Sequence, residues 1–367
     1  MWKSKHMKFL TTTEFDRKSI LVEFENFDNT KLDVGDKEIF EKLKIKFKQK
    51  DYSIISEQEI QFLQKNPKES WIGYLIHRWK FSYYENYKEF PDFPLYLILE
   101  PISICNLKCP FCHQVDEKFL KNKSQLGMMG FELFKKIIDE SQSGGTKAIT
   151  LTCRGEPTMN PEIGRMLEYC KNKFIEFKMN TNATMLNEKL IHQILDSNLT
   201  DIVFSVDSYY KEEFESLRVG ANFEKVLENI KKFVEIKEKN YPDSRIVTRI
   251  SGVKMLDEQD PEKFKEFWEN IVDFVVMVNA LPKWDLYSNS KEEMSKSPCH
   301  YLGRSLSIYF DGSVIPCDMD YQGVLNMGNV KDNTIKEIWQ GTKYKELFNS
   351  HKNNERGKHF PCDRCPA

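Results

Sequence analysis

Three cysteines share one short run of the chain, Cys105-Asn106-Leu107-Lys108-Cys109-Pro110-Phe111-Cys112, with the spacing C-x3-C-x2-C. Thiolates are the usual protein ligands of iron–sulfur clusters, and a complete site normally uses four of them. Three thiolates on one loop can hold three irons of a cubane cluster, which leaves the fourth iron open to a substrate or a cofactor. The spacing therefore predicts a cluster with chemistry at one iron.

A zinc ion is the alternative occupant of this loop. Zinc favours paired C-x2-C knuckles and a closed set of four ligands. His113 follows the third cysteine directly, so it could supply the fourth ligand. Three unrelated buried thiols are a further alternative, which the clustering of the cysteines disfavours.

A second group of cysteines lies near the end of the chain and consists of Cys299, Cys317, Cys362 and Cys365. Of the nine cysteines in the chain, only Cys153 and Cys170 fall outside the two groups. In a large cytoplasmic chain, clustered cysteines more often bind metal or do redox chemistry than form disulfides. Four thiolates could close an iron–sulfur cluster or hold a structural zinc ion, and both remain open at this point.

The composition is that of an ordinary globular protein. Of the 367 residues, 40% are hydrophobic and 30% are charged, and the formal net charge is −2. This balance gives no basic field for nucleic acid or for an anionic membrane surface. No run reaches the roughly 18 apolar residues of a membrane span, and the N-terminus lacks the apolar core of a signal peptide. We therefore expect a cytoplasmic protein with neither a membrane nor a nucleic acid as partner.

The elements that must position these cysteines alternate between strand and helix from residue 95 onward. The expected strands are Leu95–Ser103, Ala148–Thr152, Phe177–Thr181, Asp201–Asp207, Arg245–Gly252 and Phe274–Ala280. The expected helices are Phe131–Ser143, Pro161–Lys173, Asn187–Ser197, Phe223–Glu238 and Pro261–Ile271. This alternation predicts a parallel α/β structure.

Candidate functional residues follow the ends of successive expected strands. Cys105 follows the first, Arg154-Gly155-Glu156 the second, Asn182 the third and Asp207 the fourth. In parallel α/β folds the chemistry gathers at the C-terminal ends of the strands. The sequence therefore predicts one site on one rim of the sheet.

We divide the chain into three expected domains. Residues 1–94 form an α+β extension of unknown role, with a strand at Ser19–Phe27; residues 95–283 form the α/β domain; residues 284–367 form a cysteine-bearing domain. Within the last, two short strands around Asp311-Gly312 predict a hairpin that brings Cys299 and Cys317 together. A single helix is expected over Ile335–Phe348.

The cysteine loop resembles that of the radical S-adenosylmethionine (radical SAM) superfamily, including the aromatic Phe111 before the third cysteine. The resemblance implies a partial (β/α)6 TIM-like barrel and a [4Fe–4S] cluster whose open iron chelates SAM. It also implies reductive cleavage of SAM to a 5′-deoxyadenosyl radical that abstracts hydrogen from a substrate C–H bond. A reducing partner such as flavodoxin or ferredoxin would supply the electron.

Further motifs extend the resemblance to the cofactor. Arg154-Gly155-Glu156-Pro157 resembles the family's "GGEP" motif, which contacts the SAM amino group, although Arg154 stands where the first glycine is usual. Ser205 and Asp207 resemble a fourth-strand "S-x-D" signature, and Arg218 resembles the arginine that pairs with the SAM carboxylate. Asn182, at the end of the third strand, is expected to line the same pocket.

The C-terminal cysteines resemble the SPASM/twitch extension of radical SAM enzymes. Cys299, Gly312 and Cys317 match its C-x9–15-G-x4-C signature. With Cys362 and Cys365 the set fits the shorter twitch form, which implies one auxiliary [4Fe–4S] cluster. The spacing resembles that of aminocyclitol dehydrogenases.

These resemblances favour oxidation or isomerisation of a small alcohol or sugar, with the auxiliary cluster as electron acceptor. Candidate substrate contacts are Asn279, Lys283, Trp284 and Asp285. One alternative is a maturase that crosslinks or epimerises ribosomal peptides, for which Cys153 is the candidate hydrogen donor. Another is a non-catalytic iron–sulfur or zinc-binding scaffold.

Overall fold

The computed structural model describes residues 15–83, 90–280, 286–288, 298–299 and 301–366. The chain forms two compact units, Met1–Glu85 and Asn86–Ala367. The predicted boundaries at residues 94 and 283 stay predictions beside this two-unit division. Within the described ranges, none of the helices has both the length and the apolar character that a membrane crossing requires.

The described part of the first unit is helical. Its helices are α1 (Lys18–Asn26), α2 (Val34–Lys48), α3 (Glu57–Lys65) and α4 (Trp71–Tyr83). The predicted strand at Ser19–Phe27 was therefore wrong, and the described residues of the extension are not α+β. Ile20 and Phe24 are fully buried at the i, i+4 spacing of a helix face, while Val22 between them is half exposed. One-sided burial overrode the strand preference that the alternating apolar residues suggested.

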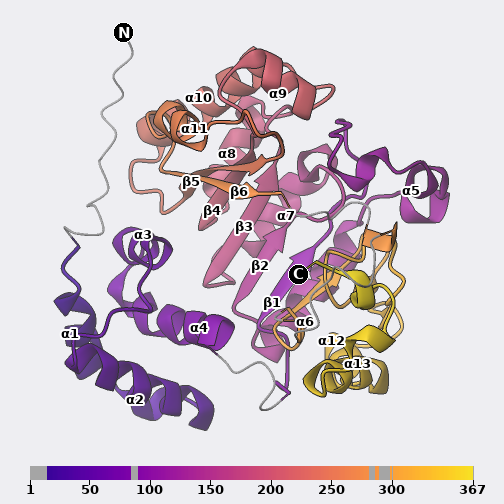
Figure 1. Ribbon diagram of the computed structural model, residues 1–367. Helices are drawn as coiled ribbons and strands as arrows, with labels where there is room; N and C mark the ends of the chain where they lie inside the picture. Colours follow the sequence, from indigo (N-terminus) through magenta and orange to yellow (C-terminus); the bar gives the residue numbers. More distant parts are fainter. Residues whose placement is uncertain (1–14, 84–89, 281–285, 289–297, 300, 367) are drawn as a thin grey trace. The chain divides into compact units, whose positions relative to one another are not determined.

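The second unit is built on a parallel sheet, as predicted (Figure 1). Its first six strands are β1 (Tyr96–Leu99), β2 (Ala148–Leu151), β3 (Glu176–Thr181), β4 (Asp201–Ser205), β5 (Val247–Lys254) and β6 (Phe274–Asn279). Each pairs in parallel with the next along the chain. Consecutive parallel neighbours require a crossover between each pair, which the intervening helices supply.

The helices between these six strands are α5 (Glu117–Lys121), α6 (Phe131–Gly144), α7 (Ile163–Cys170), α8 (Glu188–Asp196), α9 (Lys211–Leu217), α10 (Phe223–Asn240) and α11 (Pro261–Trp268). All five helices expected in this region are present. The short helices α5 and α9 were not expected. They lie in the loops after β1 and β4, on the rim where the candidate residues gather.

The cysteine-bearing tail continues the same sheet. Strand β7 (Ser305–Ile308) pairs in parallel with β1, and β8 (Ser313–Ile315) and β9 (Gly328–Asn329) follow antiparallel. The predicted hairpin is thus present as β7 and β8. The predicted single helix is two, α12 (Ile335–Trp339) and α13 (Thr342–Lys352). The break falls at Gly341, where a Cβ would meet two carbonyl oxygens of α12 at 3.0 and 3.1 Å.

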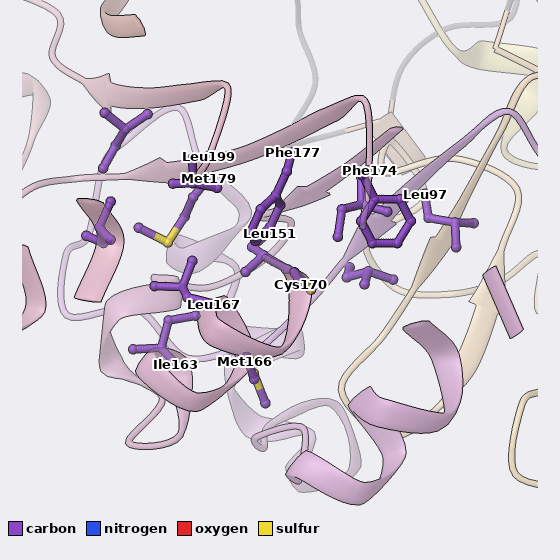
Figure 2. Close-up of a cluster of buried hydrophobic side chains, with 14 of the residues drawn as sticks. Leu97, Leu151, Ile163, Met166, Leu167, Cys170, Phe174, Phe177, Met179 and Leu199 are labelled. Atoms are coloured by element: carbon purple, nitrogen blue, oxygen red, sulfur yellow. The ribbon is translucent and has the colours of Figure 1, made fainter. Parts of the chain in front are cut away.

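A continuous hydrophobic core lies between the sheet and its helices. Figure 2 shows the part where Leu151 and Phe177 of the sheet meet Met166, Leu167 and Cys170 of α7. Cys170 is fully buried in this core, as predicted. The packing holds the sheet rigid beneath its C-terminal rim.

Candidate radical SAM site

One cavity of about 280 Å³ opens at the C-terminal ends of the parallel strands. It gathers nearly all the residues predicted for the cluster and for SAM: Cys105, Cys109, Cys112, Phe111, Cys153, Gly155, Glu156, Asn182, Ser205 and Arg218. These residues come from the loops or ends of four successive strands, β1 to β4, and the structure brings them together.

The pKa values of the three thiols of the first group are shifted in different directions. Burial raises the pKa of Cys105 to about 12 and that of Cys109 to about 11. Burial alone would also raise the pKa of Cys112, but the neighbouring His113 outweighs it and lowers that pKa. Since iron binds thiolates, loading the site must release the protons that burial favours on Cys105 and Cys109.

His113 is engaged through both ring nitrogens. Its Nε2 donates to the carbonyl oxygen of Arg154 at 3.1 Å, its Nδ1 lies 3.9 Å from the Cys112 sulfur, and its ring stacks on Tyr321. Within the described ranges, no three His, Cys, Asp or Glu side chains converge as ligands of a single metal ion would.

Gly155 is required by the protein itself. A Cβ at this position would meet the carbonyl oxygens of Ile102 and Ile104 at 2.3 and 2.5 Å. The Glu156 N–H donates to the Ile104 carbonyl at 3.0 Å. The glycine therefore lets the loop after β2 lie directly against the loop that carries Cys105.

Glu156 is held in place by its own chain. Its Oε1 accepts from the Thr158 N–H and hydroxyl and from the Thr181 hydroxyl at 2.7 Å, and its Oε2 accepts from the Asn182 N–H at 2.7 Å. Burial nevertheless raises the pKa of Glu156 against these bonds. The side chain thus ties the loop after β2 to the end of β3, and Oε2, which accepts one bond, retains an acceptor site for an ammonium ligand.

Arg218 and Asp207 form a buried pair behind the cysteine loop. The Arg218 guanidinium donates to both carboxylate oxygens of Asp207, with Nη2 to Oδ1 at 3.1 Å. Asp207 is fully buried, also accepts from the Val253 N–H, and is absent from the described cavity wall. Arg218 lines the cavity, and its charge lowers the pKa of Cys109 against the effect of burial. Asp207 therefore orients Arg218 and does not itself face the cavity.

Asn182 links the third strand to the cysteine loop. Its Nδ2 donates to Asn106 Oδ1 at 2.9 Å and lies 3.8 Å from the Cys105 sulfur. The Leu107 N–H also points to that sulfur, at 3.5 Å. Such N–H···S contacts stabilise a thiolate, so the loop is prepared to hold a metal-bound sulfur.

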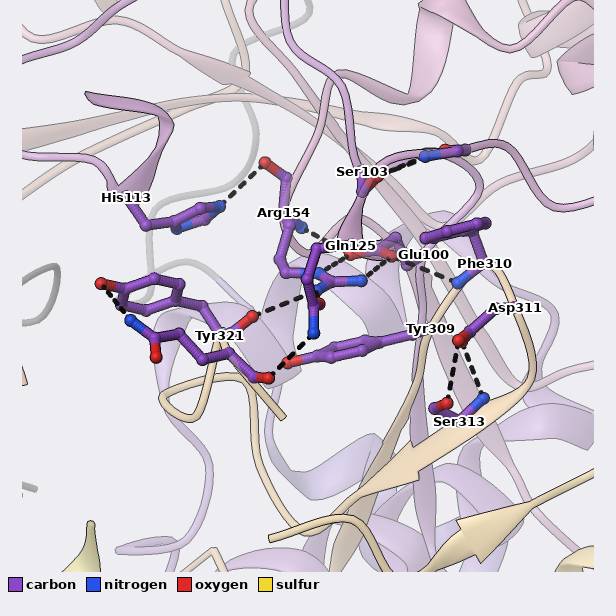
Figure 3. Close-up of polar contacts among 12 residues, drawn as sticks. Glu100, Ser103, His113, Gln125, Arg154, Tyr309, Phe310, Asp311, Ser313 and Tyr321 are labelled. Atoms are coloured by element: carbon purple, nitrogen blue, oxygen red, sulfur yellow. Dashed lines mark hydrogen bonds and ion pairs between the residues drawn. The ribbon is translucent and has the colours of Figure 1, made fainter. Parts of the chain in front are cut away.

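Arg154 fills the position where the family has glycine, and its side chain is the centre of a buried polar network (Figure 3). It forms a bidentate pair with Glu100, at 2.6 and 2.7 Å, and both side chains are essentially fully buried. Its guanidinium stacks 3.5 Å from the ring centre of Tyr309 and donates to the Tyr321 carbonyl at 3.1 Å. Tyr309 and Tyr321 belong to the cysteine-bearing tail, so Arg154 joins the SAM motif to that tail.

The second group of cysteines gathers in the tail that Arg154 contacts. The charges of Cys299, Cys362 and Cys365 add to burial in raising the pKa of Cys317, which places the four thiols in one neighbourhood. Tyr301 N–H donates to the Cys299 sulfur at 3.4 Å. All nine cysteines are free of disulfides. A four-thiol set with no disulfide fits a closed cluster, while the cavity wall includes none of these four.

Cys153 and the proposed substrate contacts remain predictions, and the structure describes the surroundings of some of them. Cys153 lines the cavity with a φ of 107°, a conformation that costs energy for a residue with a Cβ. Among the proposed substrate contacts, Asn279 ends β6 and is exposed. Lys283, Trp284 and Asp285 lie outside the described residues.

Several site residues were not expected from the sequence. Asp318, Met319 and Tyr321, which follow Cys317, form part of the cavity wall, and Glu100 anchors Arg154. Glu100 carried a usable signal, since a carboxylate at the end of an apolar strand requires a partner when buried. Asp318 carried none, because its place depends on how β7 joins β1.

Comparison with known families agrees with this geometry. Residues 99–267 match the family described as the radical SAM superfamily. Residues 299–366 match the SPASM family, described as an iron–sulfur cluster-binding domain. The two matches contain the first and the second cysteine group, respectively.

Individual relatives are more distant. A probable GTP 3′,8-cyclase of Methanococcus maripaludis is 29% identical over 133 residues, which are 36% of this chain and 43% of that protein. The chain thus spans less than half of that relative. A tungsten-containing aldehyde ferredoxin oxidoreductase cofactor-modifying protein of Pyrococcus furiosus is 23% identical over 305 residues, 68% of this chain and 82% of that protein. SuiB of Streptococcus suis bound to its precursor peptide SuiA shares the fold, with a TM-score of 0.57, 16% identity and 94% coverage of both chains.

Proposed function

Because the chain belongs to the radical SAM superfamily and carries a SPASM-type iron–sulfur domain, we propose that it oxidises a small alcohol or sugar-type substrate at a C–H bond. The auxiliary cluster is the proposed electron acceptor. We assign Cys105, Cys109 and Cys112 to the SAM-binding cluster. Cys299, Cys317, Cys362 and Cys365 are assigned to the auxiliary [4Fe–4S] cluster.

One observation carries the proposal: the cavity has the SAM-cluster thiols in one part of its wall and the loop of an auxiliary-cluster ligand in another. Asp318 and Met319 line it and directly follow Cys317. A substrate in this cavity would lie next to both redox sites. The volume of about 280 Å³ is at the lower end of ligand sites, which usually measure ≈ 300–1,000 Å³, and SAM must share it. The space therefore favours a small substrate.

When bound, SAM and its cluster supply a 5′-deoxyadenosyl radical, and the auxiliary cluster supplies an acceptor for one electron. The substrate loses a hydrogen atom from its carbinol carbon to the radical, a proton from its hydroxyl to the protein and one electron to the acceptor, and a C=O bond forms. A flavodoxin or ferredoxin is the proposed source of the electron that starts each turnover.

Asp318 is the residue we assign to the hydroxyl proton. Its carboxylate is exposed and lines the cavity. A carboxylate within hydrogen-bond reach of the substrate hydroxyl can act as general base. Arg218 is assigned to the SAM carboxylate, because a guanidinium binds a carboxylate in bidentate fashion. Phe111, Gly155, Asn182 and Ser205 complete the proposed cofactor pocket, with Glu156 and Asp207 holding it in shape.

Isotope transfer tests the proposal. The reconstituted protein would be reduced and incubated with SAM and a panel of polyols and amino sugars that are deuterated at the carbinol carbon. We expect deuterium in 5′-deoxyadenosine and one carbonyl product per 5′-deoxyadenosine. Asp318→Asn should lower product formation but leave SAM cleavage intact, whereas Asp332→Asn, on an exposed turn, should change neither.

Other results would select the alternatives. Deuterium transfer from a labelled peptide and from no polyol would favour peptide maturation, for which Cys153 is the candidate hydrogen donor. Absence of 5′-deoxyadenosine with every substrate, while both clusters are intact, would favour a non-catalytic scaffold.

A further inference from the structure

Arg356 donates hydrogen bonds to the backbone of the last two cysteines in the chain, Cys362 and Cys365. Its side chain is 2% exposed, and its Nε donates to the Cys362 carbonyl oxygen at 2.8 Å. Its Nη2 donates to the Cys365 carbonyl oxygen, also at 2.8 Å. One rigid guanidinium thus fixes both ends of the Cys362–Cys365 turn.

We propose that Arg356 is a positioning residue of the auxiliary cluster. It fixes the turn that presents Cys362 and Cys365, and its buried positive charge favours the reduced state of the cluster. The importance of this charge for catalysis rests on the proposed function, in which the cluster accepts an electron. The structural claim stands independently of any substrate.

The Arg356 guanidinium therefore places a buried positive charge beside the backbone of two of the four cysteines.

His351 fixes the backbone of a third cysteine of the group. It is fully buried on α13, and its Nδ1 accepts from the Cys299 N–H at 3.3 Å.

Reduction adds one negative charge to a cluster that already bears thiolates. A buried cation nearby stabilises that added charge more strongly than an exposed one, because the protein interior screens charges less than water does. Charged groups just beyond the metal ligands are among the means by which proteins set cluster potentials. Removing the charge of Arg356 should therefore make the cluster harder to reduce.

A redox titration followed by electron paramagnetic resonance tests this inference. The full chain would carry Cys105→Ala, Cys109→Ala and Cys112→Ala, so that only the auxiliary cluster contributes a signal. We expect Arg356→Gln to lower the reduction potential of the cluster by about 59 mV, which is a tenfold change in the equilibrium constant of a one-electron couple. Arg356→Lys, which keeps the charge, should titrate close to the parent.

Arg245 provides a matched control. It donates through the same two nitrogens to the Asn198 carbonyl, at 3.0 and 2.7 Å, and its charge acts on Asp201. Arg245→Gln should leave the potential unchanged. An unchanged potential in Arg356→Gln with full iron content would overturn the proposal.

If Arg356→Gln fails to retain iron while Arg245→Gln retains it, the positioning half of the proposal is supported. Arg356→Lys then tests whether the charge of Arg356 sets the potential. A reduction potential equal to that of the parent supports this claim, and one lower by about 59 mV, a tenfold change in the equilibrium constant, refutes it. The titration contains no substrate, so failure of the proposed oxidation would leave its result unaffected.

Discussion

The two cysteine groups are built in opposite ways. Cys105, Cys109 and Cys112 lie on one loop after β1 and border the cavity. The second group comes from three segments of the tail, which carry Cys299, Cys317 and the Cys362–Cys365 pair, and the described cavity wall includes none of these cysteines. Three thiols at a cavity leave an iron accessible, whereas four thiols away from it close a cluster. This contrast supports our proposal of radical chemistry at the first site and electron transfer at the second.

Loss of a thiol from the first site should have the largest effect. Cys112→Ala removes one of three iron ligands at the cavity, so we expect SAM cleavage and product formation to fall below detection. High-performance liquid chromatography of 5′-deoxyadenosine would measure this. Cys170→Ala, in the hydrophobic core, is the control that should retain cleavage; a Cys112→Ala protein that cleaves SAM normally would remove this loop from the chemistry.

A thiol change in the second site should separate the two activities. Cys317→Ala disrupts the electron acceptor but leaves the SAM loop intact, so we expect 5′-deoxyadenosine to form without carbonyl product. The ratio of product to 5′-deoxyadenosine should drop from near one to near zero. Equal ratios in Cys317→Ala and the parent would contradict the role of the second site as acceptor.

Arg154 makes the buried contacts that connect the loop after β2 to the cysteine-bearing tail, and a substitution there should remove them. Arg154→Met leaves the Glu100 carboxylate buried without its cation, and we expect a loss of about 3–5 kcal/mol in the free energy of unfolding. Denaturant unfolding of the protein would measure it. The double variant Glu100→Gln/Arg154→Met should recover part of this loss, because no uncompensated charge remains; a double variant less stable than Arg154→Met would refute the explanation.

The smallest effect is expected at Cys153. Burial, with the nearby Glu100 carboxylate, raises the pKa of Cys153, so its thiol stays protonated. An oxidation that ends at the auxiliary cluster requires no hydrogen donor, so Cys153→Ser should form product at the parent rate. If Cys153→Ser instead stops turnover after C–H cleavage, with deuterium from solvent no longer entering the product, the reaction is an epimerisation.

Much of the parallel domain could be predicted from the sequence, because its signals are local. Strand runs such as Ala148–Leu151 and the spacing of Cys105, Cys109 and Cys112 lie within a few residues of one another. Features that depend on distant contacts could not be predicted. The pairing of β7 with β1 and the Glu100–Arg154 pair join segments far apart in the chain.

The same contrast explains the site residues. The Gly155-Glu156 motif was recognisable, but the sequence does not reveal that the Glu156 carboxylate accepts hydrogen bonds from Thr158, Thr181 and Asn182. At the first helix, the apolar residues Ile20, Val22 and Phe24 suit a strand as well as a helix, and only burial of one face decides between them.

The most direct test of the contrast between an open and a closed cluster is whether SAM perturbs only one of them. Electron paramagnetic resonance would be recorded with and without SAM on two reconstituted proteins, one without the thiols of the first site and one without those of the second. We predict that SAM shifts the signal only of the protein that retains Cys105, Cys109 and Cys112. A SAM-induced shift in the protein that retains only Cys299, Cys317, Cys362 and Cys365 would contradict the account.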